Sequence, residues 1–227
     1  MVCAAIVTAG GVGLRMGHDI PKQYLELAGI PILARTLDVF ETHNEIEFIV
    51  LTTPKGHVDY CQSDIVERHG FRKVRNVTQG GATRQGSVLN GLRLVQDSDF
   101  VLIHDGVRPL VEASVISMCI QSAKSHGAAI AASPINDTVK RGAKFITETL
   151  SRENLWLAHT PQTFRTSLIL HAHQKAIADN FQGTDDASLI ERLGLKVAIV
   201  QDSHYNIKIT TPQDLVVAER FLTVKQP

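Results

Sequence analysis

The sequence has no excess of charge of either sign, because 23 lysines and arginines balance 23 aspartates and glutamates over 227 residues. A surface that wraps nucleic acid is strongly basic, so we expect no nucleic-acid partner. Long apolar stretches are also missing, since none approaches the roughly 20 residues of a membrane-spanning helix. The apolar run at 2–7 is too short for a secretion signal. These absences predict a cytoplasmic protein without a membrane partner.

Patterns that bind structural metals are scarce as well. Cys3, Cys61 and Cys119 are scattered, without a Cys-x-x-Cys or Cys/His spacing, which argues against a structural zinc site. Isolated cysteines suit a reducing compartment. The ten histidines include no His-Glu-x-x-His motif, and we interpret His171 and His173 as surface residues.

Short apolar runs alternate with amphipathic helical patterns along the chain. We expect strands at 2–8, 48–53, 100–104, 128–133 and 197–201, and helices near 31–42, 84–96, 112–125, 164–179, 186–193 and 212–224. This alternation is typical of an α/β protein. It predicts one Rossmann-like domain, 1–227, with a mostly parallel sheet covered by helices on both faces. Ligands of such sheets bind beyond the carboxyl ends of the strands.

The segment from about 134 to 153 breaks the alternation. Two β-prone runs flank Arg141-Gly142-Ala143-Lys144, which predicts a hairpin. The segment supplies no wide apolar face, and an isolated two-stranded hairpin is marginal in water. We therefore expect a projecting arm that packs against a second subunit. The alternative is a hairpin that lies on its own domain.

The first predicted strand leads into a glycine-rich loop, Ala9-Gly10-Gly11-Val12-Gly13-Leu14-Arg15, and Lys22 follows it. Glycines let backbone N–H groups approach an anion, and successive N–H groups form a concave phosphate site. The spacing does not fit the P-loop, which ends in Gly-Lys-Ser/Thr. Met16 stands where the dinucleotide fingerprint needs its third glycine. The loop predicts a phosphate cradle with two cations, Arg15 and Lys22.

A predicted strand ends in His104-Asp105-Gly106, at the same edge of the sheet. There Asp105 can hold Mg²⁺ as a hard oxygen ligand, or it can simply shape the turn. Arg108 follows closely and either braces this loop or faces a phosphate. Lys208 lies within an apolar strand-like segment, where a cation needs an anionic partner more than it does on the surface.

Two loops open predicted helices. The loop at 79–87 is rich in glycine, so its main-chain groups and the Ser87 hydroxyl can meet the edge of a base, while Thr83 can act as an N-cap. Thr184-Asp185-Asp186 opens a later helix. These residues either cap that helix and compensate its dipole, or present an acidic pair to a ligand.

Taken together, these segments resemble a known family. The first glycine loop with Pro21-Lys22-Gln23 resembles the signature of the sugar-phosphate nucleotidylyltransferases. Segments 104–109, 137–141, 155–164, 184–187 and 206–210 are similar to those of the 2-C-methyl-D-erythritol 4-phosphate cytidylyltransferases of the non-mevalonate isoprenoid pathway. The resemblance extends over about residues 2–222.

The resemblance implies an enzyme that joins CTP to 2-C-methyl-D-erythritol 4-phosphate, giving 4-diphosphocytidyl-2-C-methyl-D-erythritol and pyrophosphate. It implies Mg²⁺ held by Asp105, and a homodimer. The implied catalytic residues are Arg15, Lys22 and Lys208. The implied nucleotide-binding residues are Ala9, Gly10, Gly11, Gly13, Gly80, Ala82, Ser87, Asp105 and Gly106. The implied substrate-binding residues are Arg108, Thr184, Asp185 and, from the partner subunit, Thr138 and Arg152.

Two alternatives stay open. Ribitol-5-phosphate cytidylyltransferases share the glycine loop and segments 104–109 and 206–210, but lack the combination that Thr138 and Arg152 match here. A non-catalytic nucleotide-binding regulator is disfavoured because the cations and Asp105 are all present. The family commonly carries an acidic residue where this chain has Ala82, so reading of the base falls to the backbone there.

Overall fold

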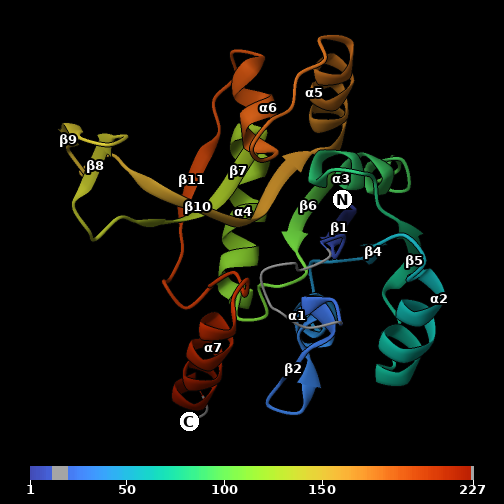
Figure 1. Cartoon of the computed structure of the whole chain (residues 1–227). Helices are drawn as coiled ribbons and strands as arrows, with labels where there is room; N and C mark the ends of the chain where they lie inside the picture. Colours follow the sequence, from blue (N-terminus) through green and yellow to red (C-terminus); the bar gives the residue numbers. More distant parts are fainter. Residues whose placement is uncertain (12–19, 226–227) are drawn as a thin grey trace.

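Seven strands form the central sheet in the computed structural model, which describes residues 1–11 and 20–225 (Figure 1). Their order across the sheet is β11-β7-β10-β6-β1-β4-β5. The strands are β1 (Cys3–Thr8), β4 (Phe48–Thr53), β5 (Val74–Gln79), β6 (Phe100–Asp105), β7 (Ala128–Pro134), β10 (Trp156–Arg165) and β11 (Ala198–Gln201). Adjacent strands are parallel, except that β10 is antiparallel to β6 and β7. The predicted mostly parallel α/β sheet is confirmed.

Helices cover both faces of the sheet, as predicted. Alternate side chains of β1 point to opposite faces. Ala5 and Val7 belong to a buried cluster with α1, α4 and the π-helix η3, whereas Ala4 and Ile6 belong to a cluster with α3, α5 and α6. The helices are α1 (Ile32–Glu41), α2 (Val58–Tyr60) continuing into η3 (Cys61–Glu67), α3 (Arg84–Leu92), α4 (Ala113–His126), α5 (Thr166–Ala178) and α6 (Ala187–Arg192). Burial on both sides explains why β1 is apolar from Cys3 to Val7.

The last helix, α7 (Pro212–Lys225), starts as the sequence predicts. Thr211 Oγ1 accepts the backbone N–H of Asp214 at 3.3 Å, and the Asp214 carboxylate accepts the N–H groups of Thr210 and Thr211 at 2.8 Å each. This helix shares a small buried cluster with Ile209 and with the hairpin of β2 (Glu26–Leu27) and β3 (Ile30–Pro31). The start of α7 therefore fixes the segment that carries Lys208.

The sequence patterns do not predict β5 and β10. β5 is one of the two edge strands and is only partly buried, so it lacks a continuous apolar run. β10 buries polar side chains, contains Pro161, and pairs with β7 through a register shift between Ala158 and Gln162. Its hydrophobic signal is therefore weak, and the helix expected from 164 starts only at Thr166.

His173 is not a surface residue, and this prediction is wrong. The side chain lies on the buried face of α5, where His173 Nε2 is 3.3 Å from Asp186 Oδ1. A hydrogen-bond partner 13 residues away in the sequence gives no local signal that the imidazole is buried. His171, two residues earlier, is exposed as expected.

The predicted hairpin is present as the antiparallel pair β8 (Val139–Gly142) and β9 (Ile146–Leu150), separate from the central sheet. In Figure 1 it projects from the body beyond β7 and β10. Phe145 and Ile146, at its turn, are 77% and 67% exposed. The hairpin does not lie on its own domain, and its packing against a second subunit stays a prediction.

Two further observations concern long apolar helices and the cysteines. No helix in the described ranges is both long and apolar enough to cross a membrane. Cys3, Cys61 and Cys119 are all buried and form no disulfide.

Gly91 provides a test of how α3 packs on the sheet. A Cβ built there would lie 2.7 Å from Ile6 Cγ2, much closer than van der Waals contact. Alanine gains about 1 kcal/mol of helix propensity, but overpacking a core costs about 1–3 kcal/mol. We expect Gly91→Ala to lower the free energy of unfolding in urea by about 1 kcal/mol. In an Ile6→Ala background the same change should be neutral or stabilising, and an equal loss in both backgrounds would contradict this packing.

Candidate active site

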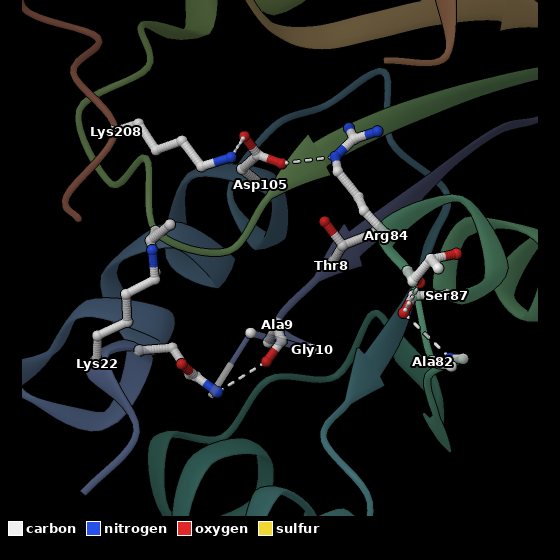
Figure 2. A pocket seen from close by; sticks show the side chains of 14 residues that line it. Thr8, Ala9, Gly10, Lys22, Ala82, Arg84, Ser87, Asp105 and Lys208 are labelled. Carbon is white, nitrogen blue, oxygen red and sulfur yellow. Dashed lines mark hydrogen bonds and ion pairs between the residues drawn. The ribbon is translucent and has the colours of Figure 1, made fainter. Parts of the chain in front are cut away.

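A pocket of about 320 Å³ opens at the carboxyl edge of the sheet (Figure 2). β1 and β6 pair so that Thr8 lies beside Asp105, which brings the loops that follow both strands together. The lining residues are Thr8, Ala9, Gly10, Gly11, Lys22, Gln23, Gly81, Ala82, Thr83, Arg84, Ser87, Asp105, Val107 and Lys208. The pocket thus gathers predicted residues of both glycine loops with Lys22, Asp105 and Lys208.

The first glycine loop enters the pocket from β1. Gln23, buried in the 3-10 helix η2 (Lys22–Tyr24), donates its side-chain N–H to the Ala9 carbonyl at 2.7 Å. This bond closes the base of the loop. Lys22 lies along the loop, because its Cε is 4.0 Å from where a Cβ on Gly11 would be. The predicted Gly13 and Arg15 lie outside the described residues, and their roles stay predictions.

The second glycine loop joins β5 to α3. Thr83 caps α3 as predicted, since its Oγ1 accepts the N–H of Gly86 at 3.0 Å. Ser87 Oγ donates to the Thr83 carbonyl at 3.0 Å and accepts the Gly81 N–H at 3.1 Å. A Cβ on Gly80 would lie 2.6 Å from Ser87 Oγ, so a side chain at this position would displace the hydroxyl. The loop therefore fixes the Ser87 hydroxyl in the pocket wall.

Three cations surround Asp105. Its Oδ1 accepts Arg84 Nε at 3.1 Å, and its Oδ2 lies 2.8 Å from Lys208 Nζ and 3.5 Å from Arg108 Nε. Thr160 Oγ1 accepts the backbone N–H of Asp105 at 3.1 Å. Burial alone would raise the pKa of Asp105, but the charges of Arg84, Lys208 and Arg108 outweigh it and hold this pKa well below its usual range. Asp105 is therefore an anion at neutral pH.

The two arginines each have a second partner. Arg84 Nη1 donates to Asp186 Oδ2 at 2.6 Å, and Arg108 Nη1 donates to the Asn206 carbonyl at 2.7 Å. The side chain of Lys208 is 38% exposed, and its ion pair with Asp105 is the one it makes within the described ranges. Of the three cations, Lys208 is the one that can turn from Asp105 to a ligand without breaking a second bond.

Arg108 thus acts as a brace, one of the two roles that the sequence allows. It is buried, and burial lowers its pKa, although Asp105 opposes this effect. Asn206, the residue it holds, also donates its side-chain N–H groups to the Thr160 carbonyl at 2.8 Å and to Asp202 at 2.6 Å. Contact of Arg108 with a substrate stays a prediction.

The remaining predicted residues are not lining residues of this pocket in the described part of the chain. Gly80 and Gly106 lie beside it and donate their N–H groups to strand carbonyls at 2.8 Å. Thr138 and Arg152 are exposed within the arm, on either side of the β8–β9 hairpin, and Arg152 donates to the Asn136 carbonyl. Their substrate contacts stay predictions.

Asp185 caps α6, as one of its two interpretations predicts. Its carboxylate accepts the backbone N–H of Ser188 at 3.0 Å and the side-chain N–H of Gln162 at 2.7 Å. Thr184 beside it is exposed. For these two residues as well, contact with the substrate stays a prediction.

The sequence patterns assign no role to Arg84 or Gln23, although both line the pocket. The two carboxylates that Arg84 binds are 21 and 102 residues away, so no local spacing reveals them. Gln23 could have been found from its place directly after Lys22 in the loop signature. Its bond to Ala9 spans 14 residues and required the fold to be known.

These features define a class of protein. A glycine loop at the carboxyl edge of a parallel sheet can hold phosphates through main-chain N–H groups. Lys22 and Lys208 add positive charge, and Asp105 is a buried carboxylate at the end of a central strand. Such a site suits transfer of a nucleotidyl group, in which charge on phosphate oxygens must be stabilised. The fold and the pocket are those of an α/β nucleotidyltransferase.

The chain belongs to the 2-C-methyl-D-erythritol 4-phosphate cytidylyltransferase family, whose model matches residues 2–224. It is 51% identical over 226 residues to the enzyme of that name from Geotalea uraniireducens, covering 98% of this chain and 97% of that one. It is 49% identical to the Geobacter metallireducens enzyme over the full length of both chains.

Solved structures agree with this membership. The 4-diphosphocytidyl-2C-methyl-D-erythritol synthase from Anaerococcus prevotii superposes with a TM-score of 0.86 at 34% identity, over 98% of this chain and 96% of that one. The cytidylyltransferase from Francisella tularensis superposes with a TM-score of 0.83 at 33% identity, over 97% of this chain and all of that one.

The different anchoring of Arg108 and Lys208 gives a stability prediction. Arg108→Met removes a buried cation and leaves the Asn206 carbonyl without its donor, so we expect it to lower the free energy of unfolding by about 2 kcal/mol or more. Lys208→Met removes a half-exposed partner and should cost less than about 1 kcal/mol. Urea denaturation followed by circular dichroism measures both. Equal losses would show that Lys208 is as much a part of the buried framework as Arg108.

Proposed function

We propose that this protein transfers the cytidylyl group of CTP to 2-C-methyl-D-erythritol 4-phosphate, giving 4-diphosphocytidyl-2-C-methyl-D-erythritol and pyrophosphate in isoprenoid precursor synthesis. The family supports this activity. The observation that carries the proposal to this chain is that Lys22, Lys208 and Asp105, from three distant segments, meet in one pocket with both glycine loops. The relatives carry the same activity in their names.

The reaction is an in-line displacement at the α-phosphorus of CTP. A phosphate oxygen of the alcohol phosphate forms the new bond, and the bond from the α-phosphorus to the oxygen that bridges to the β-phosphate breaks. The electron pair leaves with pyrophosphate. Because the nucleophile is already an anion, no general base is needed. Catalysis then depends on bringing two polyanions together and on stabilising the negative charge that spreads over the transition state.

The side chains of the pocket suit this task. Main-chain N–H groups of the first glycine loop would hold the triphosphate. Lys22 would neutralise charge on the α-phosphate and on the leaving pyrophosphate, and Lys208 would approach the α-phosphate from the side of Asp105. Arg15 is proposed to assist Lys22. Cations fixed in place before the reaction need no reorganisation as charge develops.

We propose that Asp105 helps to hold Mg²⁺. No cluster of three acidic, histidine or cysteine residues in the described ranges could enclose a metal. In phosphate-binding sites Mg²⁺ usually has one or two carboxylate ligands, and substrate phosphates and water complete its coordination shell. A single ionised Asp105 in a phosphate pocket is consistent with this coordination. When bound, the metal supplies positive charge to the phosphates of CTP.

Reading of the base would fall to the second glycine loop. The Ser87 proton is directed to the Thr83 carbonyl, so this hydroxyl can only accept a further hydrogen bond. An acceptor suits the amino group of cytosine and not the carbonyl of uracil at the same ring position. With Ala82 in place of an acidic side chain, we propose that Ser87 and the loop backbone together select the base.

The second substrate would be bound between subunits. We propose a homodimer, in which Thr138 and Arg152 from the arm of one subunit bind the alcohol phosphate at the pocket of the other. The projecting hairpin with exposed Phe145 supports this. Arg108, Thr184 and Asp185 would support the same substrate. We also propose a cytoplasmic location, which suits three unpaired cysteines.

The proposed activity is tested by pyrophosphate release. The purified protein is mixed with CTP and either methylerythritol phosphate or ribitol 5-phosphate, with and without Mg²⁺. Release with methylerythritol phosphate alone supports the proposal, release with ribitol phosphate favours the other cytidylyltransferase, and release with neither favours a regulator. Replacement of CTP by UTP or ATP tests the proposed role of Ser87.

Loss of either pocket lysine should reduce turnover strongly. Removal of one preorganised donor from such a site typically costs about 10²–10³ in rate, so we expect at least this loss for Lys22→Ala and for Lys208→Ala in the pyrophosphate assay. Lys196→Ala, outside the pocket, is the matched control and should retain activity. Near-wild-type turnover in either pocket variant would refute its catalytic role.

Mixed dimers test whether substrate residues cross between subunits. Arg152→Ala and Lys22→Ala should each be nearly inactive alone. After the two proteins are unfolded together and refolded in equal amounts, half of the dimers are mixed, and each mixed dimer contains one intact site. Recovery of roughly a quarter of wild-type activity is expected. If no activity returns while wild type refolds normally, Arg152 acts within its own subunit.

A further inference from the structure

Arg84 connects the pocket to a buried carboxylate that lies outside it. Arg84 follows Thr83, the N-cap of α3, and so lies in the second glycine loop. Its guanidinium reaches Asp105 on one side and Asp186 on the other. Figure 2 shows it across the pocket from Lys208, with Asp105 between them. An arginine shared by a pocket carboxylate and a buried carboxylate is held in one place by both.

Asp186 lies at the start of α6 but does not cap it. No backbone N–H of α6 donates to its side chain. The neighbouring Asp185 takes that role by accepting the Ser188 N–H. Asp186 is instead 1% exposed, and its two carboxylate oxygens face Arg84 and His173. Burial alone would raise the pKa of Asp186, but Arg84 and His173 outweigh it and lower this pKa. The buried carboxylate of Asp186 thus binds Arg84 and does not cap α6.

His173 completes this buried group. Its Nε2 faces Asp186, while its Nδ1 is buried without a hydrogen-bond partner among the described residues. Because a carboxylate accepts, the proton lies on Nε2. A buried ion pair and an imidazole with an unpaired nitrogen are a poor way to stabilise a core, which apolar side chains would do as well or better. Their placement points to a role in the pocket.

The geometry at Asp105 shows what that role is. Arg84 meets Asp105 through Nε alone, on Oδ1, while its Nη1 on the opposite edge is anchored to Asp186, which fixes the orientation of the guanidinium. A guanidinium released from this anchor can turn and pair its Nε and Nη2 with both oxygens of a carboxylate through two parallel bonds. Such a turn of Arg84 would place one of its N–H groups on Asp105 Oδ2, the oxygen that Lys208 Nζ approaches at 2.8 Å.

We propose that Asp186, supported by His173, is a positioning residue that holds Arg84 away from Asp105 Oδ2 and so keeps Lys208 in place for the reaction. The proposal rests on the function proposed above for Lys208. Asp186 touches no substrate in this account. It acts through Arg84 alone. An experiment that removes Arg84 can therefore distinguish this role from simple stabilisation of α6.

The first experiment is a double-mutant cycle on turnover. Asp186→Asn keeps the shape of the side chain and removes its charge. We expect kcat for pyrophosphate release to fall about 10-fold or more, since a misplaced catalytic group costs up to about 100-fold. In an Arg84→Met background the same change should alter kcat less than about twofold, because the residue through which it acts is gone. Equal losses in both backgrounds would refute the proposal.

A matched control separates this effect from general damage to α5 and α6. Asp179→Asn breaks the exposed ion pairs that Asp179 makes with Lys175 of α5 and Arg192 of α6. It should leave kcat unchanged. His173→Gln retains a donor toward Asp186 and should keep kcat closer to wild type than His173→Leu does. The reverse order would contradict the supporting role of His173.

The second experiment does not depend on the proposed reaction. Lysines are acetylated briefly with acetic anhydride, and the extent at Lys208 is compared by mass spectrometry with that at Lys196 in the same molecule. In Asp186→Asn, a Lys208 displaced from Asp105 should react several-fold faster relative to Lys196. An unchanged ratio would overturn the positioning role even if the enzyme is active. If wild type shows no pyrophosphate release but the ratio rises, the function fails and the positioning role stands.

Discussion

The ionised carboxylate of Asp105 is the feature on which the pocket depends. It is buried at the end of β6, in the middle of the sheet, and three cations from distant parts of the chain converge on it. A buried anion without partners would be very costly, so the fold must bring these cations to the carboxyl edge. Arg84 comes from the start of α3, Arg108 from the loop after β6, and Lys208 from the segment before α7. Their bonds to Asp105 hold these three segments together. The two sides of the pocket are therefore joined through one side chain.

The sequence predicts which residues lie at the ends of strands better than it predicts their tertiary hydrogen-bond partners. Lys22 and Asp105 could be identified because a glycine loop and a strand end put them at a known edge of a parallel sheet. By contrast, His173 looks like any polar helical residue, and its burial follows only from the position of Asp186 on another helix. β10 escapes prediction for a related reason, since it buries Thr160 and Gln162, whose side chains make tertiary hydrogen bonds. Hydrophobic periodicity reports burial against apolar neighbours, so it does not detect a buried polar network.

The arm, unlike the core, is not stabilised by burial within its own subunit. β8 and β9 pair only with each other, and the aromatic side chain at their turn, Phe145, is exposed. A hairpin of this kind gains little stability from its own contacts. Its sequence nevertheless supplies Thr138, and Arg152 follows it, so the residues expected to bind the second substrate are on the least supported element. A partner subunit that packs against the arm would order these residues and place them at a pocket at the same time.

The choice of lysine or arginine at each position around Asp105 also has a physical reason. A pocket for two polyanions needs positive charge, but positive charges that repel one another would destabilise the fold before any ligand binds. Asp105 and Asp186 offset two of the four positive charges of Lys22, Arg84, Arg108 and Lys208. Arg84 and Arg108 each divide their several donors between Asp105 and a second acceptor, which a planar guanidinium does well. Lys208 has a compact ammonium on a flexible stem and one ion pair in the described ranges. When phosphates arrive, the arginines lose bonds if they move, whereas Lys208 exchanges one anion for another, so the same carboxylate can both stabilise the fold and release a cation to the reaction.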